Sequence, residues 1–114
     1  MPLVASGSQL TTALEEMSAK GLGMTGIVNP EGHLIGIYTD GDVRRSINRS
    51  IDVKTTVIDQ VMVSDPRSTA ADALAAEVVQ LMRQHSINGL FAVDPEQRPI
   101  GALNALDLIR AGIF

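Results

Sequence analysis

The sequence predicts an α+β protein made of two copies of one strand-helix-strand-strand-helix unit. The chain of 114 residues repeats itself at an offset of 65 positions, which aligns Ile35-Gly36 with Ile100-Gly101. In each copy, apolar residues at helical spacing precede two short apolar runs that flank a turn, as in a helix followed by a β-hairpin. Tandem copies of one supersecondary unit usually stack and share a core.

The alignment of the two copies needs no gap from the first helix to the end of the chain. Identical residues recur along it: Met17 with Met82, Val28 with Val93, Pro30-Glu31 with Pro95-Glu96, Asp42 with Asp107, and Arg45 with Arg110. A three-stranded sheet with helices on one face buries only one side. We therefore expect the copies to pack about a pseudo-twofold axis, with two equivalent clefts between them where small ligands bind.

In the first copy, Ser8 is expected to cap a helix over 9–19, and Gly21 to end it. The apolar residues of this helix follow one stripe: Leu10, Ala13, Leu14 and Met17. The elements expected after it are a strand over 25–28, a turn at 29–32, a strand over 34–38 and a short helix over 41–47.

In the second copy, Asp72 is expected to cap a helix over 73–85. Its inward residues are expected to be Leu74, Val78, Leu81 and Met82. Strands over 90–93 and 100–103 and a closing helix over 106–111 complete the copy. The predicted domains are motif 1 over 1–50 with its first strand cut to Pro2-Leu3-Val4, a linker over 51–64, and motif 2 over 65–114.

The composition excludes several function classes. Hydrophobic residues make up 45% of the chain but aromatic residues only 3%, and the net charge is −4. Bases would find few stacking platforms and phosphate backbones would be repelled, so no nucleic-acid partner is expected. The absence of Cys and of any long apolar run predicts a cytoplasmic protein with no membrane partner.

Catalytic and metal-binding motifs are also missing from the sequence. The two histidines, His33 and His85, are far apart and have no metal-ligand spacing. No nucleophile elbow, P-loop or dinucleotide fingerprint is present. We expect no catalytic residue, no metal site and no required cofactor, and the chain itself is not expected to be an enzyme.

The segment Gly36-Ile37-Tyr38-Thr39-Asp40-Gly41-Asp42 is the most informative motif. Thr39 stands at the N-cap of the short helix and Asp42 three residues later, which is the spacing of a helix cap. The same groups would suit a ligand, because the hydroxyl and the helix start favour a phosphate and the carboxylate accepts a sugar diol. Both interpretations stay open. In the second copy, Asn104 and Asp107 hold these positions.

The tandem plan with this motif and its weaker copy, Gly101-Ala102-Leu103-Asn104-Ala105-Leu106-Asp107, resembles a pair of CBS (cystathionine beta-synthase) domains over essentially the whole chain. The resemblance implies that Thr39 and Asp42 bind the phosphate and ribose of an adenine nucleotide such as AMP or ATP. It also implies that Ile87 and Asn88 face that cleft, while Leu22 and Gly23 line the Asn104/Asp107 cleft. The Asn104 replacement favours the Thr39/Asp42 cleft if only one is occupied.

Three runs are similar to the CBS region of arabinose 5-phosphate isomerases of the KpsF/GutQ type: Lys20-Gly21-Leu22-Gly23-Met24-Thr25, Tyr38-Thr39-Asp40-Gly41-Asp42-Val43-Arg44-Arg45, and Asp107-Leu108-Ile109-Arg110-Ala111-Gly112. Those enzymes interconvert ribulose 5-phosphate and arabinose 5-phosphate on the route to Kdo, a sugar of lipopolysaccharide and some capsules. Their chemistry lies in a sugar isomerase (SIS) domain.

The resemblance implies a regulatory module attached to an SIS domain, with AMP or the nucleotide-sugar CMP-Kdo as ligand. Because CBS pairs commonly dimerise, it also implies a homodimer within a tetrameric parent. The alternative is a ligand-free oligomerisation module of the same enzyme. One departure from the family is Val61-Met62-Val63, where the linker commonly carries Val-Met-Thr.

Overall fold

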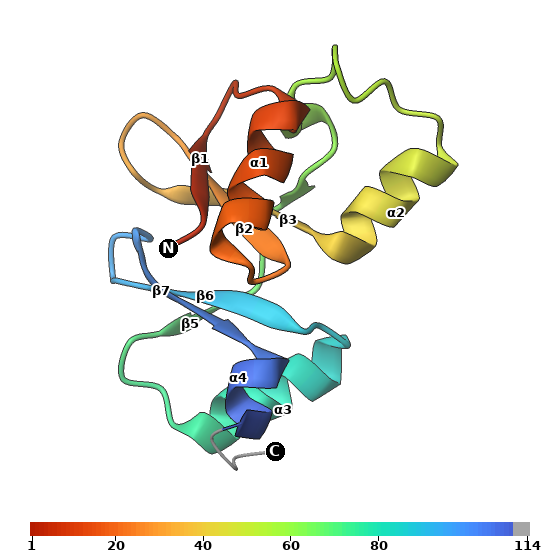
Figure 1. Ribbon diagram of the computed structural model, residues 1–114. Helices are drawn as coiled ribbons and strands as arrows, with labels where there is room; N and C mark the ends of the chain where they lie inside the picture. The colour runs from red at the N-terminus through yellow and green to blue at the C-terminus, as the bar shows by residue number, and fades with distance from the viewer. Residues whose placement is uncertain (111–114) are drawn as a thin grey trace. The chain divides into compact units, whose positions relative to one another are not determined.

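The computed structural model describes residues 1–110, with only the backbone of Arg110. The chain divides into two compact units, of which unit 1 is Met1–Pro66 and unit 2 begins at Arg67. Both mix helices with β-sheet (Figure 1), which confirms the α+β fold class. Ala111, expected at the end of the closing helix, lies outside the described residues.

Unit 1 holds a four-stranded sheet in the order β1-β2-β3-β4. Strand β1 is parallel to β2, and β2, β3 and β4 are antiparallel neighbours. In chain order its elements are β1 (Leu3–Ala5), α1 (Leu10–Lys20), β2 (Met24–Val28), β3 (Leu34–Thr39), α2 (Asp40–Asn48), a 3-10 helix η1 (Ile58–Gln60) and β4 (Val63–Ser64).

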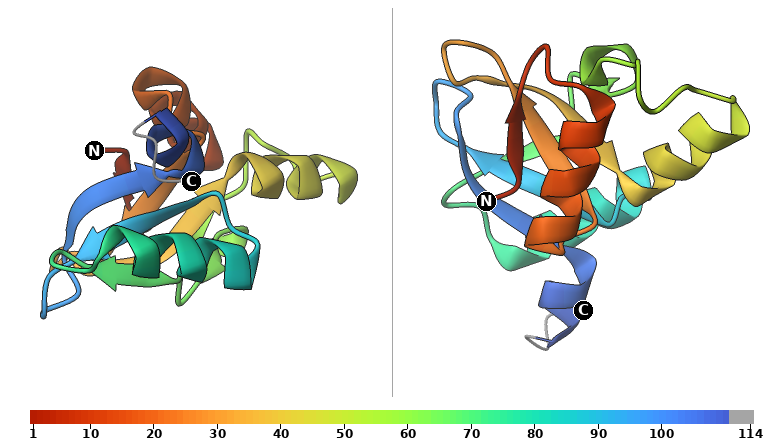
Figure 2. Two further views of the ribbon diagram at one scale, coloured as in Figure 1. Left: turned by 90° about the horizontal axis from the view of Figure 1, so that it is seen from below. Right: turned by 45° about the horizontal axis from the view of Figure 1, so that its top comes forward.

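The core of unit 1 lies between α1 and the sheet. Helix α1 crosses one face of β1 and β2 (Figure 2). The buried residues of this core are Val4, Leu10, Ala13, Met17, Ile27, Tyr38 and Ile58. The predicted stripe on α1 therefore faces inward, and Leu14 packs against the same core while partly exposed.

The N-terminal cap predicted for α1 is wrong, although Gly21 does end the helix in a left-handed conformation. The N-cap is Gln9, which makes no side-chain capping bond. The reason is that this end of the helix is held by another segment: the Leu10 amide donates to the Thr56 carbonyl at 2.8 Å, and the Ile58 amide donates to the Ser8 carbonyl at 2.8 Å. Long-range backbone pairing thus replaces the cap.

The segment predicted as a linker over 51–64 contributes to unit 1. Ile58 is fully buried in its core, and Met62 packs against that core. Strand β4 then extends the sheet by pairing Val63 with Ile37 and Ser64 with Gly36. The predicted three-stranded sheet of the first copy is therefore one strand too small, because a two-residue strand has no detectable alternation of polar and apolar residues.

Unit 2 has a three-stranded sheet in the order β5-β6-β7. Its elements are β5 (Ser68–Ala70), α3 (Ala75–His85), β6 (Gly89–Val93), β7 (Pro99–Asn104) and α4 (Ala105–Arg110). Strand β5 is parallel to β6, and β6 is antiparallel to β7. A separate core contains Val78, Val79, Met82, Leu90 and Leu108, with Leu81 packed against it.

The start predicted for α3 is also wrong. The helix begins at Ala75 with Leu74 as N-cap, and no side chain caps it. The preceding residues form a turn in which the Ala73 amide donates to the Ala70 carbonyl at 3.2 Å. Because Leu74 lies outside the helix, its side chain is 66% exposed instead of facing inward.

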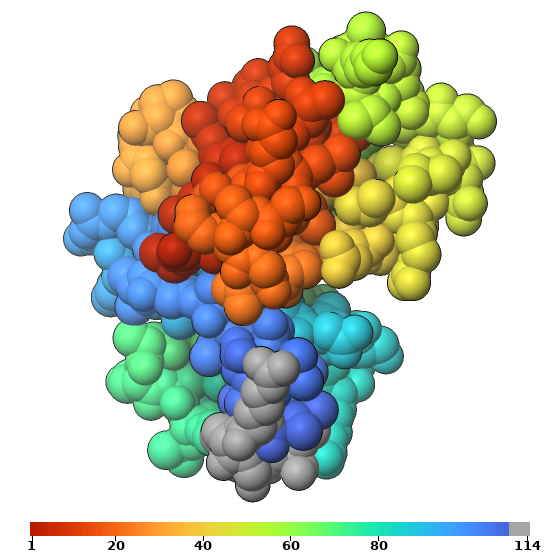
Figure 3. All heavy atoms as spheres, viewed as in Figure 1, coloured from red at the N-terminus to blue at the C-terminus, as the bar shows by residue number. Residues whose placement is uncertain are grey.

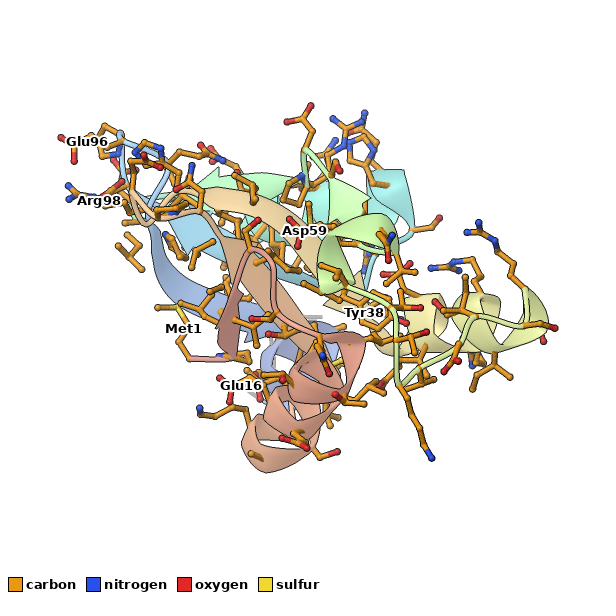
Figure 4. All side chains as sticks on the ribbon, turned by 90° about the horizontal axis from the view of Figure 1, so that it is seen from above. Met1, Glu16, Tyr38, Asp59, Glu96 and Arg98 are labelled. Carbon is orange, nitrogen blue, oxygen red and sulfur yellow. The ribbon has the colours of Figure 1, made fainter. Side chains whose placement is uncertain are left out.

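The two hairpins confirm the repeat in detail. Each has a register shift at its turn, between Ile27 and Val28 in unit 1 and between Ala92 and Val93 in unit 2. A side chain closes each turn: Asn29 accepts from the His33 amide at 2.8 Å, and Asp94 accepts from the Arg98 amide at 2.8 Å. Figure 4 labels Glu96 and Arg98 at the second turn, where they form an ion pair.

Candidate functional site at the start of helix α2

Strand β3 runs directly into α2 through Thr39. The predicted cap is confirmed, because Thr39 is the N-cap and forms a reciprocal capping box with Asp42. The Thr39 amide donates to Asp42 Oδ2 at 2.9 Å, and the Asp42 amide donates to Thr39 Oγ1 at 3.4 Å. The Thr39 hydroxyl also donates to Asp42 Oδ2 at 3.0 Å. These contacts hold both polar groups at the helix start.

The Asp42 carboxylate is buried yet ionically paired. Its side chain is 7% exposed, while that of its partner Arg45 is 67% exposed. Arg45 Nη2 donates to Asp42 Oδ1 at 2.6 Å. A carboxylate held out of water needs such a partner, because an unpaired buried charge is costly. The sequence places these residues three apart, a spacing at which helix side chains meet.

The base of α2 is fixed from the sheet side by a buried tyrosine. Tyr38, the last residue of β3 before the cap, is 1% exposed. Its hydroxyl lies 2.8 Å from the Ser46 hydroxyl, which is also buried. Figure 4 labels Tyr38 where the sheet meets α2. This hydroxyl pair was not predicted, and its only sequence signal is a polar residue on the inward face of a short helix.

Leu22 and Gly23 lie next to this junction within unit 1. The Asp40 amide donates to the Gly23 carbonyl at 3.0 Å. A Cβ added to Gly23 would lie 2.9 Å from Asp40 Oδ2, and Gly23 has a positive φ of 72°, so both space and backbone favour glycine. The residues after α1 therefore contact the start of α2.

Unit 2 repeats this contact at the equivalent positions. The Ala105 amide donates to the Asn88 carbonyl at 2.8 Å, as Asp40 does to Gly23. Asn104 accepts from the Asp107 amide at 2.8 Å, so it caps α4 as Thr39 caps α2. Asp107 is exposed whereas Asp42 is buried. Ile87 packs partly buried against the core of unit 2.

The structure thus brings some predicted site residues together. Thr39 and Asp42 lie beside Leu22-Gly23 in unit 1, and Asn104 and Asp107 lie beside Ile87-Asn88 in unit 2. The expected pairings of Thr39/Asp42 with Ile87/Asn88, and of Asn104/Asp107 with Leu22/Gly23, join residues of different units and stay predictions.

Among the hollows of the described residues, two lie within unit 1. One, of about 310 Å³, borders α2 and is lined by Asp42, Arg45, Ser46, Asn48, Arg49 and Val61. The atoms of α2, yellow in Figure 3, project from unit 1, and Arg44, Arg45 and Arg49 are exposed. The hollow beside the candidate site therefore carries two cationic side chains.

The other hollow has a volume of about 380 Å³ and lies between β1 and α1. Its charged lining residues are Glu15 and Glu16, with no cation. Lys20, one turn further along α1, pairs with Glu16 at 3.1 Å. This ion pair, together with the Leu3 amide, holds the pKa of Glu16 below its usual value. An anionic ligand is therefore disfavoured here.

Residues 1–110 contain neither a metal-binding cluster nor a membrane-spanning helix. No cluster of three or more His, Asp or Glu side chains in that range could hold a metal ion. No helix of the described part of the chain is both long and apolar enough to span a bilayer.

Comparison with known families decides the identity of the repeat. The model of the CBS domain matches residues 2–49 and again residues 58–113. The chain belongs to the CBS domain family. Each match covers one copy of the repeat, so the CBS resemblance of the sequence is confirmed and the chain is a CBS domain pair.

Among curated proteins, this CBS pair is similar to arabinose 5-phosphate isomerases named KdsD. It is 49% identical to the enzyme of Pseudomonas aeruginosa over 114 residues, which is 100% of this chain and 35% of that protein. It is 34% identical to the enzyme of Escherichia coli K12 over 113 residues, or 34% of that protein. The chain thus spans about a third of the length of these relatives.

Solved structures confirm the CBS fold. The CBS domain pair of protein MJ0100, in complex with 5′-methylthioadenosine and S-adenosyl-L-methionine, matches with a TM-score of 0.86 and 22% identity over 98% of this chain and 88% of that one. CBS protein PAE2072 of Pyrobaculum aerophilum, complexed with AMP, has a TM-score of 0.86 and 14% identity over 97% and 88% of the two chains.

Proposed function

We propose that this CBS pair is the regulatory module of an arabinose 5-phosphate isomerase, in a cytoplasmic parent protein whose SIS domain interconverts ribulose 5-phosphate and arabinose 5-phosphate. The similarity to KdsD proteins across the whole chain supports this proposal. The module would bind a nucleotide or nucleotide-sugar, such as AMP or CMP-Kdo, and so bias the isomerase of the Kdo pathway. Such control requires that the ligand bind two states of the enzyme with different affinity.

One observation carries the ligand proposal: a threonine hydroxyl and a buried carboxylate are held together at the start of α2. A helix start offers free amide donors to a phosphate, and the Thr39 hydroxyl adds another donor when it turns from Asp42 Oδ2 to the ligand. The Asp42 carboxylate accepts hydrogen bonds only, so it suits the two hydroxyls of a ribose. Two of the solved CBS proteins carry adenine-containing ligands, which supports a nucleotide.

The remaining proposed ligand residues follow from the resemblance to CBS domain pairs. Ile87 and Asn88 are proposed to complete the Thr39/Asp42 site, and Leu22 and Gly23 to complete the Asn104/Asp107 site. Asn104 lacks the hydroxyl of Thr39, and Asp107 is exposed. We therefore propose that the Thr39/Asp42 site binds its ligand more tightly.

A thermal-shift titration of the 114-residue chain tests this function. AMP, ATP, CMP and CMP-Kdo are each added up to millimolar concentration. A ligand at 100 times its dissociation constant stabilises the folded state by about 2.7 kcal/mol, which raises the melting temperature by several degrees. If none of the four ligands moves the midpoint, the nucleotide proposal is wrong.

Two substitutions locate the site. Asp42→Asn removes the charge but keeps the shape of the side chain, and is expected to abolish the shift. Asp107→Asn is the matched control in the other copy and is expected to keep most of the ligand-induced shift in melting temperature. 2′-Deoxy-AMP, which lacks one ribose hydroxyl, is expected to bind more weakly than AMP if the diol lies on Asp42. Equal effects of the two substitutions would contradict the assignment to Thr39/Asp42.

An assembly module without ligand is the second candidate, supported by apolar side chains on the two short helices. Ile47 on α2 is 63% exposed, and Leu106 and Ile109 on α4 are 50% and 56% exposed. Such side chains favour burial against another chain, in line with the proposed homodimer within a tetrameric parent. Sedimentation velocity of the chain and of Ile47→Asp tests it: a dimer that dissociates on substitution supports assembly, and a monomer at all concentrations contradicts it.

A further inference from the structure

The Asp42 carboxylate is already occupied within unit 1. Its Oδ2 accepts from the Thr39 amide and hydroxyl at 2.9 and 3.0 Å, and its Oδ1 accepts from Arg45 at 2.6 Å. With its side chain 7% exposed, the carboxylate has little surface left for a ligand. A diol that donates two hydrogen bonds must therefore displace at least one of these donors.

Arg45 is the charged donor that can leave. The reciprocal amide contacts between Thr39 and Asp42 form the helix cap, whereas the Arg45 side chain is 67% exposed and free to change rotamer. Its guanidinium also lies over the first turn of α2, because a Cβ added to Gly41 would lie 3.2 Å from Arg45 Nη2. Arg45 thus covers both the carboxylate and the helix start that the ligand has to reach.

Displacing Arg45 has opposite consequences for neutral and anionic ligands. A neutral diol takes the place of the guanidinium on Asp42 but leaves the cation without a partner and the buried carboxylate without its counter-charge. A ligand that also carries an anion offers Arg45 a new charge-assisted hydrogen bond. Arg45 then exchanges its ion pair with Asp42 for one with the anion of the ligand, so the guanidinium keeps a charged partner.

The hollow beside α2 offers the anion a position other than the helix start, and the released Arg45 lines it. It has a volume of about 310 Å³, and both Arg45 and Arg49 line it. Arg45 lies on α2 and Arg49 is the C-cap residue of that helix, so both approach the hollow from the same element. Arg49 makes no side-chain hydrogen bond or ion pair within the described part of the chain. A phosphate here would meet one cation that is unpaired and one released from Asp42.

We infer that Arg45 determines specificity by switching between Asp42 and the anionic group of the ligand, with Arg49 as the second cation. The site would then select a phosphorylated nucleoside over the nucleoside itself. This inference rests on the proposed function, because it takes Asp42 as the acceptor of the ligand diol.

Calorimetric titration of AMP and adenosine into the 114-residue chain tests the switch, since the two ligands differ only in the phosphate. AMP is expected to bind tenfold or more tighter than adenosine, on the order of one charge-assisted hydrogen bond. In Arg45→Gln, AMP should bind more weakly and adenosine more tightly, so the ratio of the two affinities falls by roughly tenfold. Arg49→Gln should weaken AMP alone.

The matched control is Arg44→Gln, which removes the same charge from the adjacent position. Arg44 does not line the hollow, so its ratio of affinities should stay within about twofold of the unsubstituted chain, allowing for weak screened long-range charge effects. An equal change in both affinities in Arg45→Gln, or the same loss in Arg44→Gln, overturns the switch.

The two proposals fail differently. If AMP binding depends on Asp42 but the ratio of the AMP and adenosine affinities is unchanged in Arg45→Gln, only the switch is wrong. If neither ligand binds the unsubstituted chain, both are wrong. Circular dichroism melting of each variant confirms that it is folded, which is expected because Arg45 is largely exposed.

Discussion

The side chain of Met62 lies directly over the Cα of Gly36. A Cβ added to Gly36 would lie 3.0 Å from Met62 Cγ and 3.2 Å from its Cε, and nearer still to Sδ. Gly36 pairs with Ser64, so this contact packs the segment after η1 onto β3. The repeat supplies a comparison, because among the described residues a Cβ on the equivalent Gly101 would meet only Ala92 Cβ, at 3.8 Å.

Gly36→Ala is therefore expected to destabilise the protein and Gly101→Ala is not. Overpacking of this kind costs about 1–3 kcal/mol, because the whole Met62 side chain has to move. The methyl group of Gly101→Ala has space, and the substitution reduces the backbone freedom of the unfolded chain. It should therefore raise the free energy of unfolding by under about 1 kcal/mol. Urea unfolding of both variants measures the difference.

A double variant identifies the cause. Met62→Ala removes the obstructing side chain, so Gly36→Ala should cost less in that background than in the unsubstituted chain. An additive result would mean that the strain at position 36 does not come from Met62.

Thr39→Ala is expected to destabilise α2. The hydroxyl caps the helix and donates to Asp42, and loss of an N-cap costs about 0.5–2 kcal/mol. The long contact of 3.4 Å between the Asp42 amide and Thr39 Oγ1 places the expected cost in the lower half of that range. Thr39→Ser keeps the hydroxyl and should recover most of the stability in the same urea titration. If Thr39→Ala unfolds at the same urea concentration as the unsubstituted chain, the hydroxyl does not support the helix.

The cap of α2 could be predicted because its signal is local, and the repeat because identical residues recur at a constant offset. Thr39 and Asp42 lie three residues apart, and the matching of Gly36 with Gly101 fixes the hairpins of both copies. The starts of α1 and α3 could not be predicted from Ser8 and Asp72. The first is set by pairing with the distant residues 56–58, and the second by a turn before the helix.

The cap formed by Thr39 and Asp42 was predicted, but the ion pair that engages Asp42 was not. The sequence places a hydroxyl and a carboxylate at the start of a helix, whereas the engagement of Asp42 by Arg45 depends on the rotamer of a long side chain. The i to i+3 spacing permits this pair but equally permits an exposed arginine. The hydroxyl pair of Tyr38 and Ser46 depends in turn on how deeply α2 packs.

Tyr38→Phe is expected to destabilise the β3–α2 junction. The substitution keeps the ring but leaves the buried Ser46 hydroxyl without its partner at 2.8 Å, at a cost of about 1–2 kcal/mol. Ser46→Ala should cost a similar amount, since it leaves the Tyr38 hydroxyl only a long contact of 3.5 Å to the Asp42 carbonyl. In the double variant neither group is left unpaired, so its destabilisation should be smaller than the two single effects added together. Strict additivity in thermal unfolding would contradict a direct bond.

Asp59 is expected to make folding stability depend on acid pH. Its carboxylate accepts from the Ser6 hydroxyl and, at 2.7 Å, from the Gly7 amide, which ties the loop after β1 to η1. The Ser6 hydrogen bond is the main cause that lowers the pKa of Asp59 below its ordinary value of 3.8. Because the folded pKa is the lower one, this stabilisation is fully present above the ordinary pKa and is lost as the pH falls through the folded value. Asp59→Asn should therefore be less stable than the unsubstituted chain at pH 7, with a difference that shrinks below pH 4.

The matched control is Asp72→Asn, whose parent side chain is exposed and makes no hydrogen bond or ion pair within the described residues. Urea unfolding between pH 7 and pH 3 should give nearly parallel stability curves for Asp72→Asn and the unsubstituted chain. The curve for Asp59→Asn should instead converge on them at low pH, because protonation removes the same charge that the substitution does. A difference at Asp59 that stays constant down to pH 3 would show that the loop is held by the shape of the side chain and not by its charge.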